Sequence, residues 1–223
     1  MNYNELVEKT IVGHKKLYGC KPSVISYAPG RIEILGNHTD YNLGTTLSAA
    51  INMGICFTIS KSEKNEINVN ALDFKESIIF DPEDSKKINH INWANYIKGV
   101  FYYFNKLNVK SGGLNCSFSG SIPMGSGLSS SAALEVAVSF AIQEYCKSSI
   151  SLKIIAEISQ KAEQNFAGCN CGLLDQYSSI YGVNSALIHS DFMTHEIKTV
   201  NISKKAIFLM INSNTTHELS ESP

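Results

Sequence analysis

The sequence lacks the features that mark membrane, secreted or nucleic-acid-binding proteins. No apolar run approaches the roughly 20 residues that a membrane-spanning helix needs. The N-terminal segment MNYNELVEKT contains no apolar signal-peptide core. The formal net charge is only −1, from 19 basic and 20 acidic residues, so no excess charge points to nucleic acid or a membrane surface. We therefore expect a cytoplasmic protein with neither a nucleic-acid nor a membrane partner.

Cysteine spacings typical of zinc sites are also absent. Of the six cysteines, only Cys169 and Cys171 lie close together in the sequence. A zinc site would need two further ligands, for which His189 and His195 are the nearest downstream candidates, but the usual spacings are missing. Reduced thiols in the core of a cytosolic protein are the better interpretation.

What the sequence does contain is a mixed succession of helix and strand patterns. The spacing of apolar residues predicts helices over residues 3–18, 93–107, 129–146, 151–166 and 172–181. Apolar or alternating runs predict strands over residues 23–29, 45–60, 66–71, 77–80 and 112–122, and in the segments SALIH and AIFLMIN. Because strands and helices do not alternate strictly, this order predicts an α+β fold.

One stretch joins glycines and serines directly to an apolar helix pattern: GSIPMGSGLSSSAALEVAV, residues 120–138. Glycine allows backbone conformations that other residues avoid and lets a ligand approach the backbone closely. The serines can cap the helix that follows. The first N–H groups of that helix lack internal partners and lie at the positive end of its dipole. A phosphate group fits such a position, and a purely structural turn is the alternative.

Two common phosphate-binding motifs do not fit this stretch. Gly120 and Gly125 have the Walker A spacing, but Ser126 and Gly127 stand where that motif requires Lys followed by Ser or Thr. The Rossmann pattern fails because Ser130 occupies the place of its third glycine. The stretch is therefore either a third kind of phosphate loop or only a glycine-rich turn.

Two further segments concentrate polar residues between apolar ones. APGRIEILGNHTDYNLG, residues 28–44, contains Asp, Asn and His side chains that can hydrogen-bond sugar hydroxyls, with ordinary turn capping as the alternative. In EQNFAGCNCGLLDQYSSIYG, residues 163–182, Asp175 follows two leucines, where a carboxylate is costly unless it is paired. A buried Asp near an Arg can act on a substrate hydroxyl. The alternative is an acid that stabilises the start of a helix.

Together these segments resemble the GHMP kinase family, and within it the branch that phosphorylates galactose. GRIEILGNHTDYNLGTTLSAAI is similar to the N-terminal signature of that branch, and PMGSGLSSSAALEVA resembles the ATP-phosphate motif of the family. AEQNFAGCNCGLLDQYSS is similar to the segment that carries the catalytic aspartate of the family. WANYIKGV also resembles a segment of the same branch. The resemblance implies a GHMP-kinase N-terminal domain (ribosomal protein S5 domain 2-like) over residues 1–203, with a mixed, mostly antiparallel sheet backed by helices. Residues 204–223 would be the truncated start of a second domain.

The resemblance also implies a cytoplasmic, monomeric parent that uses ATP and Mg²⁺ to phosphorylate the C1 hydroxyl of galactose. By position, Asp175 is the catalytic aspartate and Arg31 its positively charged partner, which would stabilise charge on the transferring phosphoryl group. The other assignments follow by the same matching: Asn37, His38, Asp40 and Gly172 to the sugar, Trp93, Gly125, Gly127, Leu128, Ser129 and Ser130 to the nucleotide, and Ser131 and Glu163 to the metal. Hard oxygen ligands suit Mg²⁺. For Trp93, simple core packing is an equal alternative.

Departures from the family pattern leave other functions open. Asn37 stands where the family usually has Glu, so the sugar can also be another hexose, an N-acetylhexosamine or a uronic acid. A third, glycine-rich motif and a tyrosine of the sugar site are absent, so the chain resembles the N-terminal half of a kinase. An inactive fragment and a non-catalytic sugar and ATP sensor are therefore alternatives. The intact GLSSSAAL, together with Arg31 and Asp175, favours an active parent, and GNHTDYN speaks against a mevalonate- or homoserine-type kinase.

Overall fold

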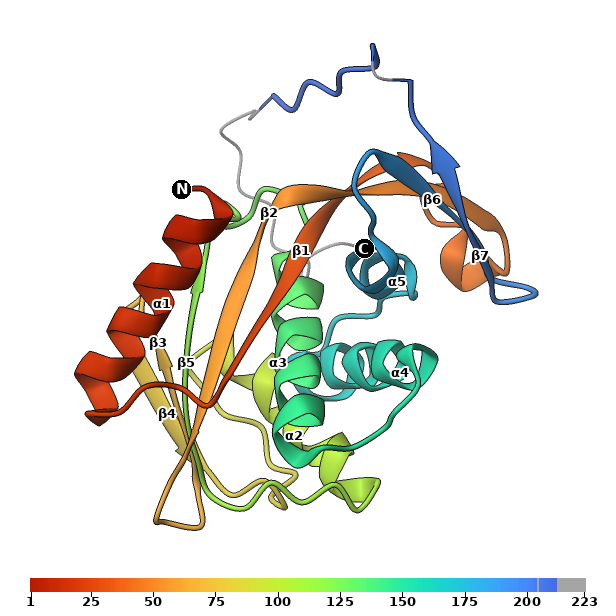
Figure 1. Cartoon of the computed structure of the whole chain (residues 1–223). Coiled ribbons are helices and arrows are strands. Elements are labelled where there is room, and N and C mark those ends of the chain that lie inside the picture. Colours follow the sequence, from red (N-terminus) through yellow and green to blue (C-terminus); the bar gives the residue numbers. More distant parts are fainter. Residues whose placement is uncertain (204, 212–223) are drawn as a thin grey trace.

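The computed structural model describes residues 1–203 and 205–211, and within them the main feature is a seven-stranded sheet (Figure 1). Its order is β4-β3-β5-β2-β6-β7, and β1 pairs with β2 off this path. The strands are β1 (Val24–Leu35), β2 (Thr45–Lys61), β3 (Ile67–Ala71), β4 (Glu76–Phe80), β5 (Leu114–Gly120), β6 (Ala186–Asp191) and β7 (Glu196–Asn201). Only the β3–β5 pair is parallel among these described pairs, so the sheet is mixed and mostly antiparallel, as predicted.

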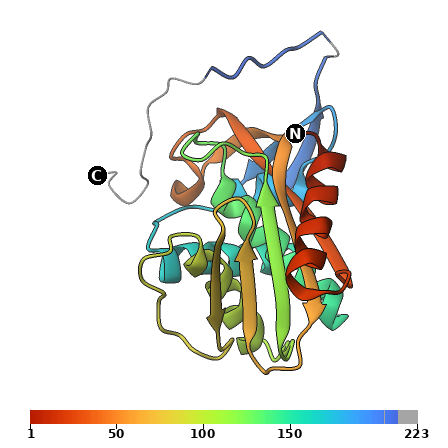
Figure 2. The same cartoon turned by 90° about the vertical axis from the view of Figure 1, so that its left-hand side faces the viewer.

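Helices cover both faces of this sheet (Figures 1 and 2). They are α1 (Tyr3–Tyr18), α2 (Ala94–Lys106), α3 (Ser130–Cys146), α4 (Leu152–Ala162) and α5 (Leu174–Tyr181), with a 3-10 turn at Asp40–Asn42 and a π-helical turn at Glu163–Ala167. Helix α1 packs on β2 and β5, whereas α3 packs on β1 and β2 from the other side and contacts α2, α4 and α5. None of the helices in the described ranges is long and apolar enough to cross a membrane.

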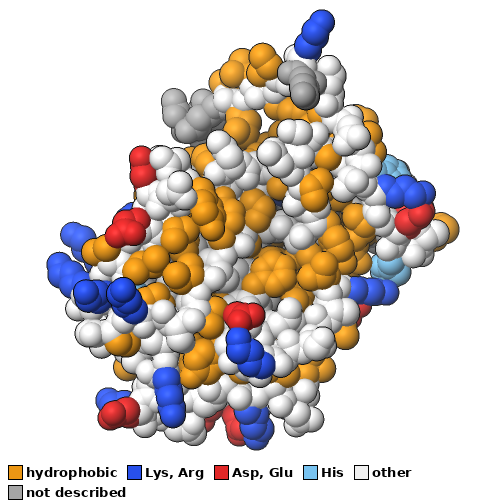
Figure 3. All heavy atoms as spheres, viewed as in Figure 1, with side chains coloured by type: hydrophobic (Ala, Val, Ile, Leu, Met, Phe, Trp, Pro, Cys, Tyr) orange, Lys and Arg blue, Asp and Glu red, His pale blue; other side chains and the backbone are white. Residues whose placement is uncertain are grey.

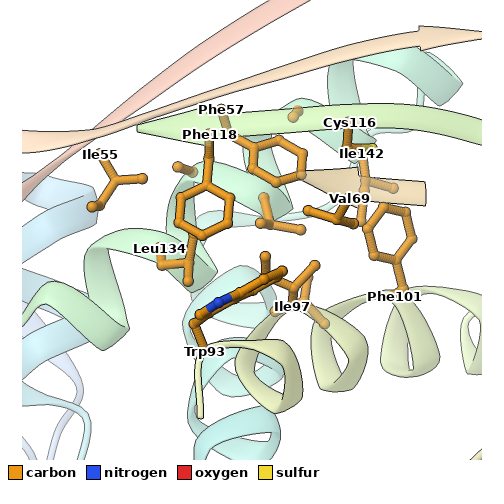
Figure 4. Packing of buried hydrophobic residues seen from close by; sticks show 14 of the residues in the cluster. Ile55, Phe57, Val69, Trp93, Ile97, Phe101, Cys116, Phe118, Leu134 and Ile142 are labelled. Carbon is orange, nitrogen blue, oxygen red and sulfur yellow. The ribbon is translucent and has the colours of Figure 1, made fainter. Parts of the chain in front are cut away.

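The main hydrophobic core lies between the sheet and helices α2 and α3 (Figure 4). Phe57 of β2 and Phe118 of β5 stack with ring centroids 6.4 Å apart, and the indole of Trp93 meets Phe118 edge-on at 5.1 Å. Leu134 of α3 and Ile97 of α2 close the same cluster. Burial of side chains of this size is the main source of stability, because each contributes roughly 1.5–3 kcal/mol.

The opposite face of the sheet carries a buried polar cluster beneath α1. The His14 ring of α1 shares hydrogen bonds with the hydroxyls of Thr58 (3.0 Å), Ser60 (2.8 Å) and Ser117 (3.1 Å). Thr58 and Ser60 alternate along β2 with Phe57, which enters the apolar core, because successive strand residues point to opposite faces. The sheet therefore separates an apolar layer from a hydroxyl-rich one.

Most predicted elements are confirmed within two or three residues, and the differences have local causes. The predicted strand over 23–29 extends to Leu35, because its pairing with β2 continues through two register shifts. Strand β7 was not predicted, because most of its residues are exposed and polar. The predicted helix over 151–166 ends as an α-helix at Ala162, where a π-helical turn follows.

The expected strand AIFLMIN is wrong for residues 206–211, which form no strand. A strand needs a hydrogen-bonded neighbour, and these residues pair with none in the described ranges. Residue 212 and most of the expected second-domain segment 204–223 lie outside the described residues. The proposed boundary between two domains therefore stays a prediction.

One face of the protein leaves apolar surface uncovered. In Figure 3, hydrophobic side chains spread over the middle of this face and most charged side chains lie toward its margin. A hollow of about 470 Å³ is lined by residues of β1, β2 and the segment after α5, and by Phe208 and Met210. The neighbouring Ile207 and Leu209 are 90% and 82% exposed.

Candidate active site

Arg31 and Asp175 form an ion pair although 144 residues separate them in the chain. Arg31 lies on β1, and Asp175 lies in the first turn of α5. The Nε of Arg31 donates to Oδ1 of Asp175 at 2.8 Å, and a terminal nitrogen of the same guanidinium lies 2.7 Å from that oxygen. Their side chains are only 15% and 25% exposed, so water screens the pair little. The predicted partnership of these two residues is thus present in the geometry.

The same arginine ties β1 to the glycine-rich loop. Its Nη1 donates to the carbonyl of Gly127 at 2.6 Å, and its backbone N–H donates to the carbonyl of Leu128 at 3.1 Å. Gly125 and Gly127 have φ values of 64° and 69°, a left-handed conformation that favours glycine. A Cβ on Gly30 would lie 2.5 Å from the Leu128 carbonyl, so only glycine allows the strand and the loop to approach so closely.

The serines at the start of α3 face carboxylates rather than the helix backbone. Ser129 occupies the N-cap position with φ 57°, and its side chain makes no capping hydrogen bond. Its hydroxyl donates instead to Oδ2 of Asp175, and the hydroxyl of Ser131 donates to Oε1 of Glu163 at 2.8 Å. Ser129 therefore gives no side-chain cap, because its left-handed backbone departs from the extended conformation that is usual at this position. The N-cap hydroxyl consequently does not compete for the N–H groups of the first turn.

Glu163 is almost fully buried, with an exposed fraction of 2%. Its second oxygen accepts a hydrogen bond from the Gln176 amide at 2.9 Å and one from the Cys171 thiol at 3.4 Å. Burial raises the pKa of Glu163, and the hydrogen bond from Ser131 opposes that rise. The Ser131 hydroxyl and the Glu163 carboxylate are adjacent hard oxygen donors beside the loop, and this donor set fits Mg²⁺.

Asp40 contacts the start of α5, so the polar segments 28–44 and 163–182 come together. Its Oδ2 accepts a hydrogen bond from the backbone N–H of Leu174 at 3.3 Å. A Cβ on Gly172 would lie 1.8 Å from the same oxygen, which explains glycine at that position. Asn37 and His38 are exposed in the loop after β1, and their contact with a sugar stays a prediction.

Glu33 is a further acid at this site, to which the sequence analysis gave no role. It lies on the same face of β1 as Arg31, because β1 pairs regularly with β2 between the two residues. Burial raises the pKa of Glu33, and the positive charge of Arg31 lowers it, while Asp175 and Asp40 raise it further. Glu33 is therefore close enough to the ion pair to influence the charge of the site.

Two buried residues beside the site, Glu135 and Gln176, were missed as well. Both side chains are 0% exposed. Glu135 lies one turn after Ser131, and its sequence signal is a single acid within the apolar run AALEVAVSFAI. Nothing in the sequence distinguishes Gln176, which directly follows Asp175, because its importance depends on its packing against Glu163.

Trp93 lies in the hydrophobic core with 9% of its surface exposed. Its indole N–H donates to the Glu76 carboxylate of β4 at 2.7 Å. The structure thus accounts for Trp93 by packing, the alternative that the sequence left open. Its assignment to the nucleotide stays a prediction.

The cysteines are free thiols, as expected. Across residues 1–203 and 205–211, no group of three or more His, Cys, Asp or Glu side chains is placed to hold a metal ion. A zinc site at Cys169 and Cys171 therefore has no support in the described residues, and any Mg²⁺ beside Ser131 and Glu163 would need other oxygen ligands, such as phosphates.

Comparison with known proteins gives matches over most of the chain. Residues 95–183 match the family described as GHMP kinases N terminal domain, and residues 13–61 match the galactokinase galactose-binding signature. A galactokinase of Actinobacillus pleuropneumoniae is 37% identical over 203 residues, which are 91% of this chain and 53% of that protein. A galactokinase of Thermotoga maritima is 36% identical over 197 residues, 87% of this chain and 54% of its own length.

Solved structures agree with these matches. The structure of Lactococcus lactis galactokinase complexed with galactose has a TM-score of 0.80 at 28% identity, covering 90% of this chain and 52% of that one. A mevalonate kinase of Methanococcus jannaschii, at 20% identity and a TM-score of 0.63, shares the fold over 82% of this chain and 56% of its own. The chain spans about half the length of the curated relatives that it matches. It belongs to the GHMP kinase family, and within that family it matches the N-terminal portion of the galactokinases.

Proposed function

We propose that this chain carries the sugar- and ATP-phosphate-binding part of a galactokinase. The reaction is transfer of the γ-phosphoryl group of ATP to the C1 hydroxyl of galactose. The similarity of residues 13–61 to a galactose-binding signature supports the choice of sugar. Asn37 keeps other hexoses, N-acetylhexosamines and uronic acids in the panel of substrates to test.

The observation that carries the proposal is the fixed orientation of the Asp175 carboxylate. Arg31 holds one oxygen and the Ser129 hydroxyl holds the other, directly beside the glycine-rich loop. A carboxylate held in this way can accept a hydrogen bond from a sugar hydroxyl and orient that hydroxyl toward a phosphate on the loop. Both oxygens of Asp175 thus have defined partners before any substrate binds.

The other roles follow from charge and position. Arg31 stabilises negative charge that develops on the transferring phosphoryl group, and the loop backbone with the N-terminus of α3 binds phosphate oxygens. Asp40 accepts hydrogen bonds from sugar hydroxyls beside Gly172. Ser131 and Glu163 would hold Mg²⁺, which would supply positive charge to the phosphates. Positioning and electrostatics carry most of the catalysis in reactions of this class.

The test measures ADP release by this chain with ATP, Mg²⁺ and a panel of hexoses that includes galactose. Asp175→Asn keeps the size of the side chain and removes its charge, and Asp81→Asn is the matched control at an exposed position. We expect galactose-dependent turnover that Asp175→Asn lowers by orders of magnitude and that Asp81→Asn leaves unchanged. Equal turnover by the two variants would remove Asp175 from the mechanism.

Because the chain spans about half the length of its relatives, ligand binding is measured in parallel. A ligand at about 100 times its Kd stabilises a protein by about 2.7 kcal/mol. For a chain of this size, that free energy raises the melting temperature by about 5–10 °C. If galactose and MgATP give neither turnover nor a higher melting temperature, the proposal is wrong.

A further inference from the structure

Three buried oxygens next to the proposed metal site have no hydrogen-bond partner among the described residues. They are both carboxyl oxygens of Glu135 and the side-chain carbonyl oxygen of Gln176. Both side chains are fully buried, so bulk solvent does not reach these atoms. An ionised carboxylate without a partner is far too costly to keep in such a place. Glu135 must therefore gain either a counter-charge or a proton.

A proton on Glu135 removes the buried charge and supplies a donor for one of these acceptors. A neutral carboxyl group gains an O–H donor, and the Oε1 of Gln176 is an acceptor that lacks a donor. Helices α3 and α5, which carry the two residues, pack against each other. Burial is the largest cause that raises the pKa of Glu135 well above its ordinary value, and the charge of Glu163 raises it further. The Gln176 amide would lower the pKa by donating to an ionised Glu135, but neither Glu135 oxygen has a hydrogen-bond partner in the described residues.

A hydrogen bond from Glu135 to Gln176 would matter because the nitrogen of the same Gln176 amide binds Glu163. Its Nε2 donates to Oε2 of Glu163 at 2.9 Å, while Ser131 donates to the other oxygen of Glu163 at 2.8 Å. If the side-chain amide of Gln176 were flipped, its carbonyl oxygen would face the carboxylate of Glu163 and repel it. A donor on the Oε1 side prevents this rotation, so it fixes the orientation of Glu163 as well.

We propose that Glu135 is a neutral carboxylic acid that donates a hydrogen bond to Gln176, and that this pair positions Glu163 as a metal ligand. Glu135 and Gln176 are positioning residues, since both would act on the metal only through Glu163. The positioning part rests on the proposed function, because that function assigns Mg²⁺ to Ser131 and Glu163. The protonation of Glu135 does not depend on it.

Infrared spectroscopy at neutral pH tests the protonation without any ligand. We expect a carbonyl stretching band of a protonated carboxyl group, which Glu135→Gln removes. The control Glu144→Gln, at an exposed position of the same helix, leaves the band in place. Gln176→Met removes the acceptor and shifts the band to higher frequency. Absence of the band, or its persistence in Glu135→Gln, would overturn the proposal.

Metal binding tests the positioning, with Mn²⁺ as the probe and electron paramagnetic resonance as the readout. Removal of an outer partner of a metal ligand lowers metal affinity by about 10–100-fold, so we expect such a loss in Glu135→Leu. Glu135→Gln keeps a neutral donor of the same shape and restores the affinity. If Glu135→Leu does not fold, Gln176→Met interrupts the same contacts from the other side.

The two parts can fail separately. Equal Mn²⁺ affinity in the parent chain and the Leu or Met variant, or an equal loss in Glu135→Gln, would overturn the positioning role. No Mn²⁺ binding by the parent chain would overturn it too, together with the metal site of the proposed function. Neither result changes the infrared band.

Discussion

The buried imidazole of His14 predicts a specific loss of stability in mild acid. His14 is fully buried between α1 and the sheet, and its hydrogen-bond partners are the uncharged hydroxyls of Thr58, Ser60 and Ser117. Burial lowers the pKa of His14 from 6.5 to about 4, because the imidazolium would lose its hydration. Replacing the ring by the uncharged side chain of glutamine removes this titration.

The size and sign of the effect follow from the two pKa values. In the unfolded chain His14 binds a proton near its ordinary pKa of 6.5, whereas in the folded protein it does so only near 4. The stabilisation by the neutral ring is therefore complete above pH 6.5 and is lost as the pH falls from there through about 4. The complete loss is about 3 kcal/mol, and about 2 kcal/mol of it is reached near pH 5.

Urea unfolding at pH about 7 and about 5 measures this loss. Between these two pH values, the parent chain should lose about 2 kcal/mol more free energy of unfolding than His14→Gln does. Glu135 and Glu163 titrate with the opposite sign, since their raised pKa values favour the folded state in acid, but they do so equally in both proteins. His90→Gln, at an exposed position, should behave like the parent. The same pH dependence in His14→Gln and the parent would refute the reasoning.

Three further predictions concern the loop, a buried charge and the single tryptophan. Gly30→Ala places a Cβ 2.5 Å from the Leu128 carbonyl and should cost about 1–3 kcal/mol, read as a lower melting temperature; an unchanged value would contradict the close approach. Asp84→Ala should lower the urea midpoint more than Lys98→Met does. The Lys98 side chain is only 3% exposed, and Asp84→Ala leaves its buried ammonium without a partner, whereas Lys98→Met removes the ammonium itself. Equal midpoints would contradict this. Trp93 is the only tryptophan, so ATP should change the intrinsic fluorescence if the residue contacts the nucleotide, and unchanged emission would leave Trp93 a core residue alone.

Much of the fold could be predicted from the sequence, because its segments follow simple periods. The helices over 3–18 and 93–107 were predicted within a residue, although α1 buries Thr10 and His14 beside Leu6 and only α2 buries a mainly apolar face. The strand AIFLMIN was predicted from apolar composition alone, which does not supply the partner that a strand requires. Strand β7 had the opposite problem, because its pairing with β6 holds an exposed, polar sequence in place.

The site was predicted only where the resemblance to a family supplied positions. No spacing rule pairs Arg31 with Asp175, because the sheet and α5 bring them together across 144 residues. Glu135 and Gln176 could not be predicted, since their importance lies in which buried atoms lack partners, and that depends on the packing of α3 against α5. The resemblance proposes which residues carry the chemistry, and the structure shows what holds them in place.

The charges around the glycine-rich loop explain why a cation belongs in the proposed mechanism. The carboxylates of Asp175 and Glu163 both lie at the start of α3, and each accepts a hydrogen bond from one of its serines. The single guanidinium of Arg31 already pairs with Asp175. A triphosphate bound there would meet uncompensated negative charge from Glu163, which the partial charge of a helix N-terminus only partly offsets. A divalent cation held by Ser131 and Glu163 would compensate this charge, and it would also offset the burial that raises the pKa of Glu163.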